Sequence, residues 1–591
     1  MMQHRKLRSF AVSMGLAGAA AAAWSTPASA CGGFFCSQQQ PVNQAAERII
    51  FADNGDGTIT AVIQILYQGP SENFSWLLPI STVPEGDQLG VASDIAFTRL
   101  QFATNPQFNL TQAVEGECRT DRPRGDVANP SDLRENCSDN PLLAECQADL
   151  PDQDINGNPI NVEASGVVGA FDYSVLSVEP GQADPVAPAL EWLGQNGYDV
   201  TPEGARLMEP YLADGMYLLA LRLTKGSDTG SIRPIKVTYR ASAPMIPIKL
   251  TAVAANADMG VMTWALSSAR AVPMNYNALE LNEARINWFN AASNYEQVVT
   301  EAADEAGGKG FVTEFAGPSS QLADVVWQQG EENDWQSVKN TTYFSFDQLF
   351  QAIFQRYQAQ SGFWDAVRRS VTLAEGLSFE DFRRCPGCYS EQVTFSPSAL
   401  LAAIEADVIE PLRGVQEMID RAPYVTRLYS TMSAAEMTVD PVFVFNPELP
   451  EVSNVHQATQ VTECNPNVYR FEAPWRIDFP QGTSVRGTPD TNGQWPDATN
   501  DTPPNFRVFQ LAAAGEGQLV ADNSGTIGEL LQAYNDGIPT PSGSGPLERD
   551  TGACSLGRPS SSNSPRALGV LSLLGACLWR RRARRVTPPR A

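Results

Sequence analysis

The sequence predicts an α+β protein with a β-rich, mainly antiparallel N-terminal domain and a more helical C-terminal region. Two observations support this class. Short apolar runs with an alternation of two residues, typical of strands, occur over residues 48–80 and 166–268, and helical patterns do not alternate regularly with them. From about residue 345 the apolar residues instead recur every three or four positions, which indicates amphipathic helices.

The first strands are expected between Arg48 and Ile80. The runs RIIFA and TITAVIQILY flank the sequence NGDGT at residues 54–58, and FSWLLPI follows them. Asn and Gly at such a junction are typical of a hairpin turn. NGDGT also resembles a phosphatase D-x-D-G-T motif, but Asn54 stands where the nucleophilic aspartate is required, so we interpret the segment as a turn.

More strands follow a polar, Cys-containing insertion at residues 116–159. GVVGAFDYSVLSV, MYLLALRLT and IRPIKVTYRA are expected to be strands, and ALEWLGQNGYDV is expected to be a helix. MIPIKLTAVAA and GVMTWALSS continue this domain, and residues 276–306 are predicted to be helical in part.

Two helices are predicted in the second half. Ser345 and Gln348 form a capping-box pair ahead of the first helix. Its apolar face, which we interpret as core, consists of Phe346, Leu349, Phe350, Ile353, Phe354 and Tyr357. The second helix is expected from about Ser398, with Leu400, Leu401, Ile404 and Val408 on its apolar face. Short extended pieces return from Met437, and residues 481–504 have the composition of a loop.

These patterns divide the chain into six predicted regions. They are a signal peptide at 1–30, a β-rich α+β domain at 31–317 containing the insertion at 116–159, a helical region at 318–435, a mixed extended region at 436–538, a linker with a sorting cysteine at 539–566, and an apolar helix with an Arg-rich tail at 567–591.

The first thirty residues predict export. Basic residues from His4 to Arg8 precede an apolar run at 10–24, and Ala28-Ser29-Ala30 is a small-residue cleavage site. Cleavage there makes Cys31 the first residue of the mature chain. A lipoprotein signal is the alternative, although Ala28 stands where such a signal normally has Leu.

The C-terminal end resembles the sorting tail that is widespread in myxobacteria. Cys554 is followed by a polar spacer, an apolar run at 567–579 and a cluster of arginines. As a helix this run would cover about 20 Å, against about 30 Å for a bilayer core. The resemblance implies cleavage next to Cys554, lipidation of the new end, and display at the cell surface or outer membrane. A membrane anchor that stays attached is the alternative.

The charge of the mature body excludes one class of partner. Three of the 41 Lys and Arg lie in residues 1–30 and eight lie in residues 554–591, whereas all 67 Asp and Glu lie between them, so the body has 30 basic residues and a net charge of −37. Nucleic acid prefers basic surfaces and is therefore not expected as a partner. The expected partners are a membrane, reached through the tail or its lipid, and the export and sorting machinery; the ligand is unknown.

Histidine is too scarce for several catalytic classes. Once His4 is removed, only His456 remains, which excludes a multi-histidine zinc site and would force any His-dependent triad to use this residue. No G-x-S-x-G, H-E-x-x-H or G-x-x-x-x-G-K-[ST] motif is present. We interpret His456 as an ordinary loop residue and expect neither a catalytic centre nor an organic cofactor.

An even number of cysteines in an exported body predicts disulfide bonds. The candidates are Cys31, Cys36, Cys118, Cys137, Cys146, Cys385, Cys388 and Cys464. Their pairing stays open, and a tight Cys31–Cys36 loop is one alternative because two glycines separate its ends. Cys385 and Cys388 form a C-P-G-C motif, which we interpret as a structural disulfide. A thiol–disulfide exchange centre or half of a metal site are the alternatives.

Residues 152–163 fit the calcium-loop pattern D-x-[DN]-x-[DN]-G-x5-E. The oxygen ligands would come from Asp152, Asp154, Asn156, Asn158 and Glu163. The flanking prolines and the strand pattern that follows are not those of an EF-hand, so an Asp/Asn/Gly turn is the alternative. Calcium is the one cofactor that the sequence leaves open, and residues 490–497 offer a weaker match.

Several longer motifs resemble an uncharacterised bacterial family, domain of unknown function 2330, over residues 31–317. They are CGGFFC, PVNQAAERIIF, FSWLLPI, NGYDVTPE, PMIPIKLTAVAANADMGV and NYEQVVTEAADEAGGKGFVTEFAG, and YVTRLYSTMSAAEMTVDPVF at 424–443 is also similar. The resemblance implies an exported protein, often with such a tail, and brings no activity or site residues.

The leading prediction is therefore an exported, cell-surface-anchored, disulfide-stabilised protein with a binding or structural role. An extracytoplasmic thiol–disulfide oxidoreductase acting through the C-P-G-C motif and a calcium-dependent adhesin are the alternatives.

Overall fold

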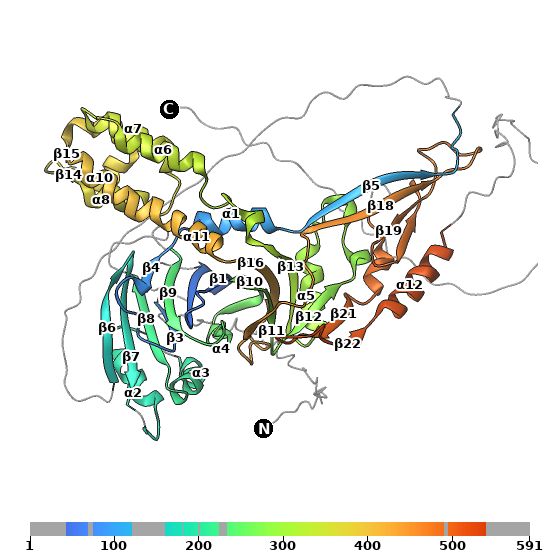
Figure 1. Ribbon diagram of the computed structural model, residues 1–591, viewed down its shortest axis with the longest axis horizontal. Coiled ribbons are helices and arrows are strands. Elements are labelled where there is room, and N and C mark those ends of the chain that lie inside the picture. The colour runs from blue at the N-terminus through green and yellow to red at the C-terminus, as the bar shows by residue number, and fades with distance from the viewer. Residues whose placement is uncertain are drawn as a thin grey trace, which may run out of the picture. The chain divides into compact units, whose positions relative to one another are not determined.

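The computed structural model describes residues 43–68, 75–120, 160–179, 181–198, 201–223, 233–489 and 494–538. All of them fall within one compact unit, Met1–Pro541. The predicted α+β class is confirmed: the N-terminal half is rich in mostly antiparallel strands, and most of the helices come later in the chain (Figure 1).

A ten-stranded sheet forms the centre of this unit, in the order β22-β21-β12-β13-β16-β10-β1-β2-β9-β4. Its β1–β10 and β12–β13 pairs are parallel, and the other pairs are antiparallel. The strands are β1 (Asn43–Asp53), β2 (Thr58–Gln68), β4 (Leu89–Val91), β9 (Ile235–Arg240), β10 (Ala255–Ser267), β12 (Asn277–Leu281), β13 (Gly310–Pro318), β16 (Tyr424–Met432), β21 (Asn505–Gln510) and β22 (Gln518–Asp522). Strands from the predicted regions 31–317, 318–435 and 436–538 all enter this one sheet.

The β1–β2 hairpin shows why the NGDGT segment is a turn. Gly55 and Gly57 both have positive φ, at 74° and 83°, a conformation that glycine adopts without steric cost. The Asn54 side-chain amide donates hydrogen bonds to the hydroxyl oxygens of Thr58 and Thr60, at 2.9 and 3.0 Å. Backbone conformation and side-chain bonding thus close the turn between the strands.

Helices cover one face of the central sheet. The first are α1 (Asp94–Thr104) and α5 (Tyr295–Glu305). They are followed by α6 (Gln329–Asn340), α7 (Phe346–Tyr357), α8 (Phe363–Ser370), α9 (Phe379–Arg384), α10 (Pro397–Ile404) and α11 (Glu410–Arg421). A π-helical turn, Glu405–Ile409, joins α10 to α11, so the second predicted helix continues to Arg421. Side chains of these helices share one core with inward-facing residues of β1, β2 and β10.

The apolar stripe predicted for α7 lies in the core. Five of its six residues are buried, and Phe354 is partly buried. The capping pair is only half formed, because the Ser345 hydroxyl accepts from the backbone N–H of Gln348 at 3.3 Å, whereas the Gln348 side chain accepts from the N–H of Phe344.

A four-stranded sheet packs against the opposite face of the central sheet. Its order is β3 (Ser75–Ile80), β8 (Tyr217–Leu223), β7 (Phe171–Val178) and β6 (Ile160–Val168). Its other face carries α2 (Val186–Gln195) and α3 (Pro202–Ala213). The run GVVGAFDYSVLSV, predicted as one strand, is instead the β6–β7 hairpin, which turns at Gly169 with φ of 60°. MIPIKLTAVAA contains the short helix α4 (Ile248–Thr251).

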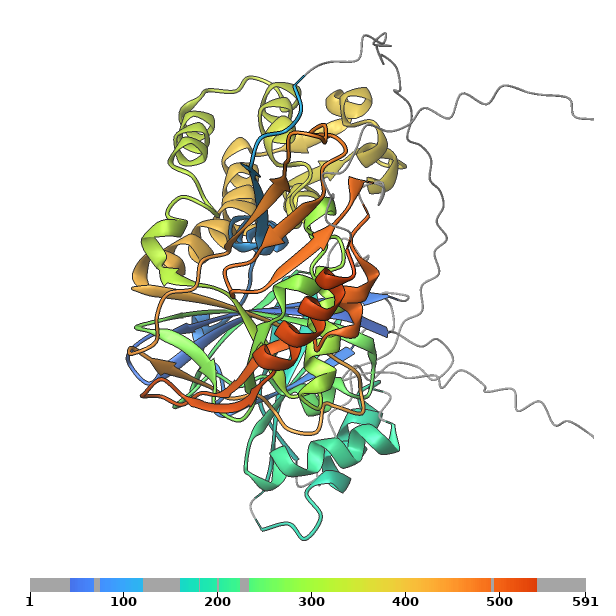
Figure 2. The ribbon, with the colours of Figure 1, turned by 90° about the vertical axis from the view of Figure 1, so that its right-hand side faces the viewer.

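A third sheet lies beside the C-terminal edge of the central sheet, in the order β20 (Ser484–Gly487), β19 (Trp475–Asp478), β18 (Val455–Glu463) and β5 (Gln107–Glu115). The pair β5–β18 is parallel over its full length. Helix α12 (Ser524–Asp536) packs on β20 and β21 (Figure 2). Two small sheets complete the described strands: β11 (Arg270–Pro273) with β17 (Phe443–Asn446), and β14 (Val371–Leu373) with β15 (Val393–Phe395).

Among the residues described, no helix has the length and apolar character needed to span a bilayer. The predicted signal peptide at 1–30 and the apolar run at 567–579 lie outside the described residues.

Candidate functional site

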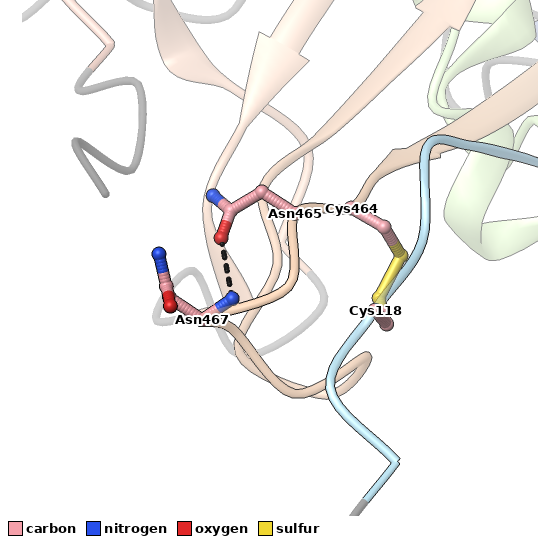
Figure 3. The surroundings of a disulfide bond; sticks show 4 residues. All are labelled: Cys118, Cys464, Asn465 and Asn467. Carbon is pink, nitrogen blue, oxygen red and sulfur yellow. Dashed lines mark hydrogen bonds between the residues drawn. A yellow bond between two sulfur atoms is a disulfide. The ribbon is translucent and has the colours of Figure 1, made fainter.

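A disulfide closes the end of the β5–β18 ribbon. Cys118 and Cys464 are 346 residues apart in the sequence, and their Cα atoms are 4.6 Å apart (Figure 3). The chain turns immediately beyond the bridge, where the side-chain oxygen of Asn465 accepts a hydrogen bond from the backbone N–H of Asn467 at 2.9 Å. Gly116 has positive φ, and a Cβ there would lie 2.3 Å from the Cys464 carbonyl oxygen, so no larger residue fits beside the bridge.

Cys385 and Cys388 form a second, local disulfide, with Cα atoms 5.3 Å apart. Cys385 lies between the end of α9 and the 3-10 helix Pro386–Gln392, and the backbone N–H of Cys388 donates to the Cys385 carbonyl at 3.0 Å. Cys385 is half-buried and Cys388 is exposed. A helix precedes the motif and a 3-10 helix follows it, which differs from the strand-to-helix setting usual for thiol–disulfide exchange.

The remaining predicted site residues are described only in part. Cys31, Cys36, Cys137, Cys146, Cys554 and the loop residues Asp152, Asp154, Asn156 and Asn158 lie outside the described residues. The fifth predicted calcium ligand, Glu163, is exposed in β6 and accepts a hydrogen bond from Ser177 of β7. Within the described ranges, no three His, Cys, Asp or Glu residues are grouped so that they could hold a metal ion. The calcium loop stays a prediction.

His456 has an acidic partner that the sequence does not indicate. It lies in strand β18 and not in a loop, and its Nδ1 is 3.0 Å from Oε1 of Glu283, 173 residues earlier in the chain. Its ring stacks on Phe108 of β5, with centroids 4.6 Å apart and planes inclined by 11°. The carboxylate and the ring face together fix the orientation of the imidazole.

A buried ion pair joins β13 to β16. The guanidinium Nε of Arg427 lies 2.6 Å from Oε2 of Glu314, and the two side chains are only 2% and 1% exposed. Nη1 of Arg427 also donates to Thr104 Oγ1 at 3.1 Å and to Asn105 Oδ1 at 2.8 Å, at the end of α1. The Tyr295 hydroxyl hydrogen-bonds Glu314, and burial raises the pKa of this tyrosine. This group joins α1, α5 and the two strands of the sheet.

A cavity of about 80 Å³ lies between the central sheet and the β3–β8 layer. Its floor consists of buried side chains from β1, β2 and β3. Its rim consists of Ser81 and of half-buried residues just before β8, in β9 and after β9. The lining residues are Ile49, Phe51, Ala61, Ile63, Leu78, Pro79, Ser81, Met216, Tyr239, Ala241, Ala243, Met245 and Pro247.

The lining of this cavity is almost entirely apolar. Its two polar side chains are those of Ser81 and Tyr239. The Ser81 hydroxyl donates to the backbone carbonyl of Arg240 and is therefore already engaged. Burial raises the pKa of Tyr239, so its hydroxyl is neutral at physiological pH. None of the lining side chains carries a charge.

Glu47 does not line this cavity, but it lies on β1 two residues before Ile49, which does. It is 3% exposed, and its carboxyl accepts long hydrogen bonds from Gln44 Nε2 at 3.3 Å and Thr251 Oγ1 at 3.5 Å. Thr251 ends α4, and Pro247, which precedes α4, lines the cavity. Burial raises the pKa of Glu47 to about 7, and the two hydrogen bonds offset this only in part.

Segments that carry the family resemblance meet at this cavity. PVNQAAERIIF supplies Glu47 and two floor residues, FSWLLPI supplies two more, and PMIPIKLTAVAANADMGV supplies two rim residues and Thr251. Each segment alone looks like an ordinary core strand or loop, so the sequence gives no sign of a cavity. We take the cavity together with Glu47 as the candidate functional site.

Comparison with known proteins identifies one family. Residues 25–328, just over half of the 591-residue chain, match the family described as an uncharacterized protein conserved in bacteria, DUF2330. No curated protein and no solved structure matches the chain. The matched range includes every residue that lines the cavity, and Glu47. The chain belongs to the DUF2330 family of bacterial proteins.

Proposed function

We propose that this DUF2330 protein is exported, anchored at the cell surface and stabilised by disulfides, and that it has a binding or structural role. The observation that carries the proposal is the Cys118–Cys464 bridge. Disulfides between distant segments persist in oxidising compartments and are rare in the cytosol. The signal-like residues 1–30 and the tail after Cys554 support the same location.

The cavity supports a binding role rather than a catalytic one. Ligand sites are typically concave, mainly apolar and furnished with a few polar groups, and the DUF2330 segments gather around a cavity of that character. A catalytic site would require a nucleophile, an acid–base pair or a metal directed into it. The lining offers instead one engaged serine and one neutral tyrosine.

Intact-mass measurement of the protein isolated from its native cells tests the proposal. The expected mature chain begins at Cys31 and is either cleaved and lipidated at Cys554 or retains its tail. Reduction followed by alkylation should label Cys118 and Cys464, which alkylation without reduction should leave unmodified. The matched variant Cys554→Ser should abolish lipidation and leave cleavage after Ala30 unchanged.

Two results would overturn the proposal. One is a chain that retains residues 1–30 and carries free thiols at Cys118 and Cys464. The other is a protein recovered wholly inside the cells and protected from protease added to intact cells.

A further inference from the structure

We propose that the cavity between the β1–β2 hairpin and β3 binds the end of an aliphatic chain, of the kind carried by fatty acids and membrane lipids. The inference rests on the proposed function, because it assigns a ligand class to the binding role. It is carried by the size of the cavity, by the chemistry of its wall and by the difference between its floor and its rim.

The size favours a narrow chain. At about 80 Å³ the cavity has roughly half the volume of an engineered protein cavity of about 150 Å³ that binds benzene. A substituted ring would therefore need the walls to move, whereas a few methylene groups in line would fit. The buried floor residues resist such movement, because β1 is hydrogen-bonded on both sides, to β2 and to β10.

The chemistry of the wall disfavours a charged or strongly polar occupant. A polar group that leaves water without gaining a hydrogen bond is strongly disfavoured. The Ser81 hydroxyl is already bonded to a backbone carbonyl, Tyr239 offers a single neutral hydroxyl, and no charged side chain lines the cavity. The charged end of a fatty acid or lipid would consequently remain outside, and only its hydrocarbon end would enter.

The rim is suited to admitting such a chain. Met216 and Met245 are half-buried there, and their unbranched side chains adapt to irregular apolar shapes. Ala241 and Ala243 are also half-buried and present only methyl groups. The floor is thus fixed by the sheet, whereas the entrance consists of small or flexible side chains.

Calorimetric titration of the purified full-length protein with three soluble probes tests the proposal. The probes are n-hexanol, hexanoate, and dihexanoylphosphatidylcholine kept below its micelle concentration. Saturable binding of n-hexanol with a negative heat-capacity change is expected, because apolar surface becomes buried. Tighter binding of hexanoate than of the phospholipid would assign the site to free fatty acids, and the reverse order would assign it to membrane lipids.

Variants at the rim locate the site. Ala243→Leu should fill the entrance and weaken n-hexanol binding by about tenfold, the equivalent of two lost methylene contacts. The matched control Ala513→Leu lies in the exposed loop between β21 and β22, and this variant should bind n-hexanol like the parent protein. Met245→Ala should enlarge the cavity and shift the preference from n-hexanol towards n-octanol. This variant keeps the test decisive if Ala243→Leu does not fold.

Three results would overturn the inference: no saturable heat with any probe, equal binding by Ala243→Leu and the parent, or tighter binding of N-acetyl-leucinamide than of n-hexanol. The last would assign the cavity to peptide side chains. None of these results bears on export or disulfide formation, which the mass measurement tests separately.

Discussion

Replacing Glu47 by Gln is expected to stabilise the protein at neutral and alkaline pH and to leave it almost unchanged at pH 4. Glu47 is 3% exposed, and within the described part of the chain the side chains that bond to it are the neutral ones of Gln44 and Thr251. Burial raises its pKa to about 7, against about 4.3 for a glutamate in an unfolded chain. At about 1.4 kcal/mol per pH unit, ionised Glu47 costs the folded state roughly 4 kcal/mol.

The pH dependence results from the raised pKa of Glu47. Below about pH 4 the carboxyl is protonated in both the folded and the unfolded protein, so the folded state bears no cost for a buried charge and keeps its full stability. As the pH rises towards 7 the unfolded chain releases the proton first, and the free energy of unfolding falls. Glutamine stays neutral throughout and accepts the same two hydrogen bonds. The gain from Glu47→Gln should therefore grow between about pH 4 and pH 7 and then level off.

Urea unfolding of both proteins, followed by tryptophan fluorescence at pH 4, 6 and 8, measures this difference. The matched control Glu529→Gln removes an exposed carboxylate on α12 and should change the free energy of unfolding by less than about 0.5 kcal/mol. Equal stability of Glu47→Gln and the parent at pH 8 would refute the reasoning. It would show that a cation or water compensates the buried carboxylate.

Three further predictions concern the long-range disulfide, an ion pair and the central sheet. Replacing both Cys118 and Cys464 by Ser should lower the free energy of unfolding by about 6 kcal/mol by the loop-entropy model, which denaturant titration under non-reducing conditions would detect. Glu332→Gln should lower the free energy of unfolding by about 1–2 kcal/mol at pH 7 and change it little near pH 2. Partial burial opposes ionisation of Glu332, but hydrogen bonds from Gln336, Arg413 and Trp327 lower its pKa to about 2. Unfolding at both pH values tests this, and a constant difference would contradict it. A fragment of residues 43–328 should not fold cooperatively, because it lacks β16; a sharp thermal transition in its circular dichroism would show otherwise.

Local sequence determined the elements that were predicted well. The turn after β1 is dictated by Asn54 and two glycines, and α7 by an apolar stripe at helical spacing, so both could be predicted without knowing their neighbours. The β6–β7 hairpin was wrongly predicted as one strand because its turn contains a single glycine, Gly169, inside a continuous apolar run. The short helix α4 was missed for a similar reason, since proline flanks apolar residues there on a strand-like background.

The candidate site could not be predicted because it depends on contacts between distant segments. Glu47 reads as the polar member of an alternating strand, yet both faces of β1 are covered, so it is buried without a charged partner. His456 was expected in a loop, and its partner Glu283 precedes it by 173 residues. The C-P-G-C motif needed no tertiary information, because both of its cysteines lie in one local turn.

The strand order makes the family-matched segment dependent on a strand from later in the chain. β16 lies between β10 and β13 and pairs with both, so residues 25–328 alone leave a gap in the middle of the sheet. Pro318, the last residue of β13, pairs directly with Tyr424, the first residue of β16. The intervening helices are consequently an insertion within a strand pair, and they share a core with one face of the sheet. β16 cannot be removed without cost, because its Arg427 is the ion-pair partner of the buried Glu314.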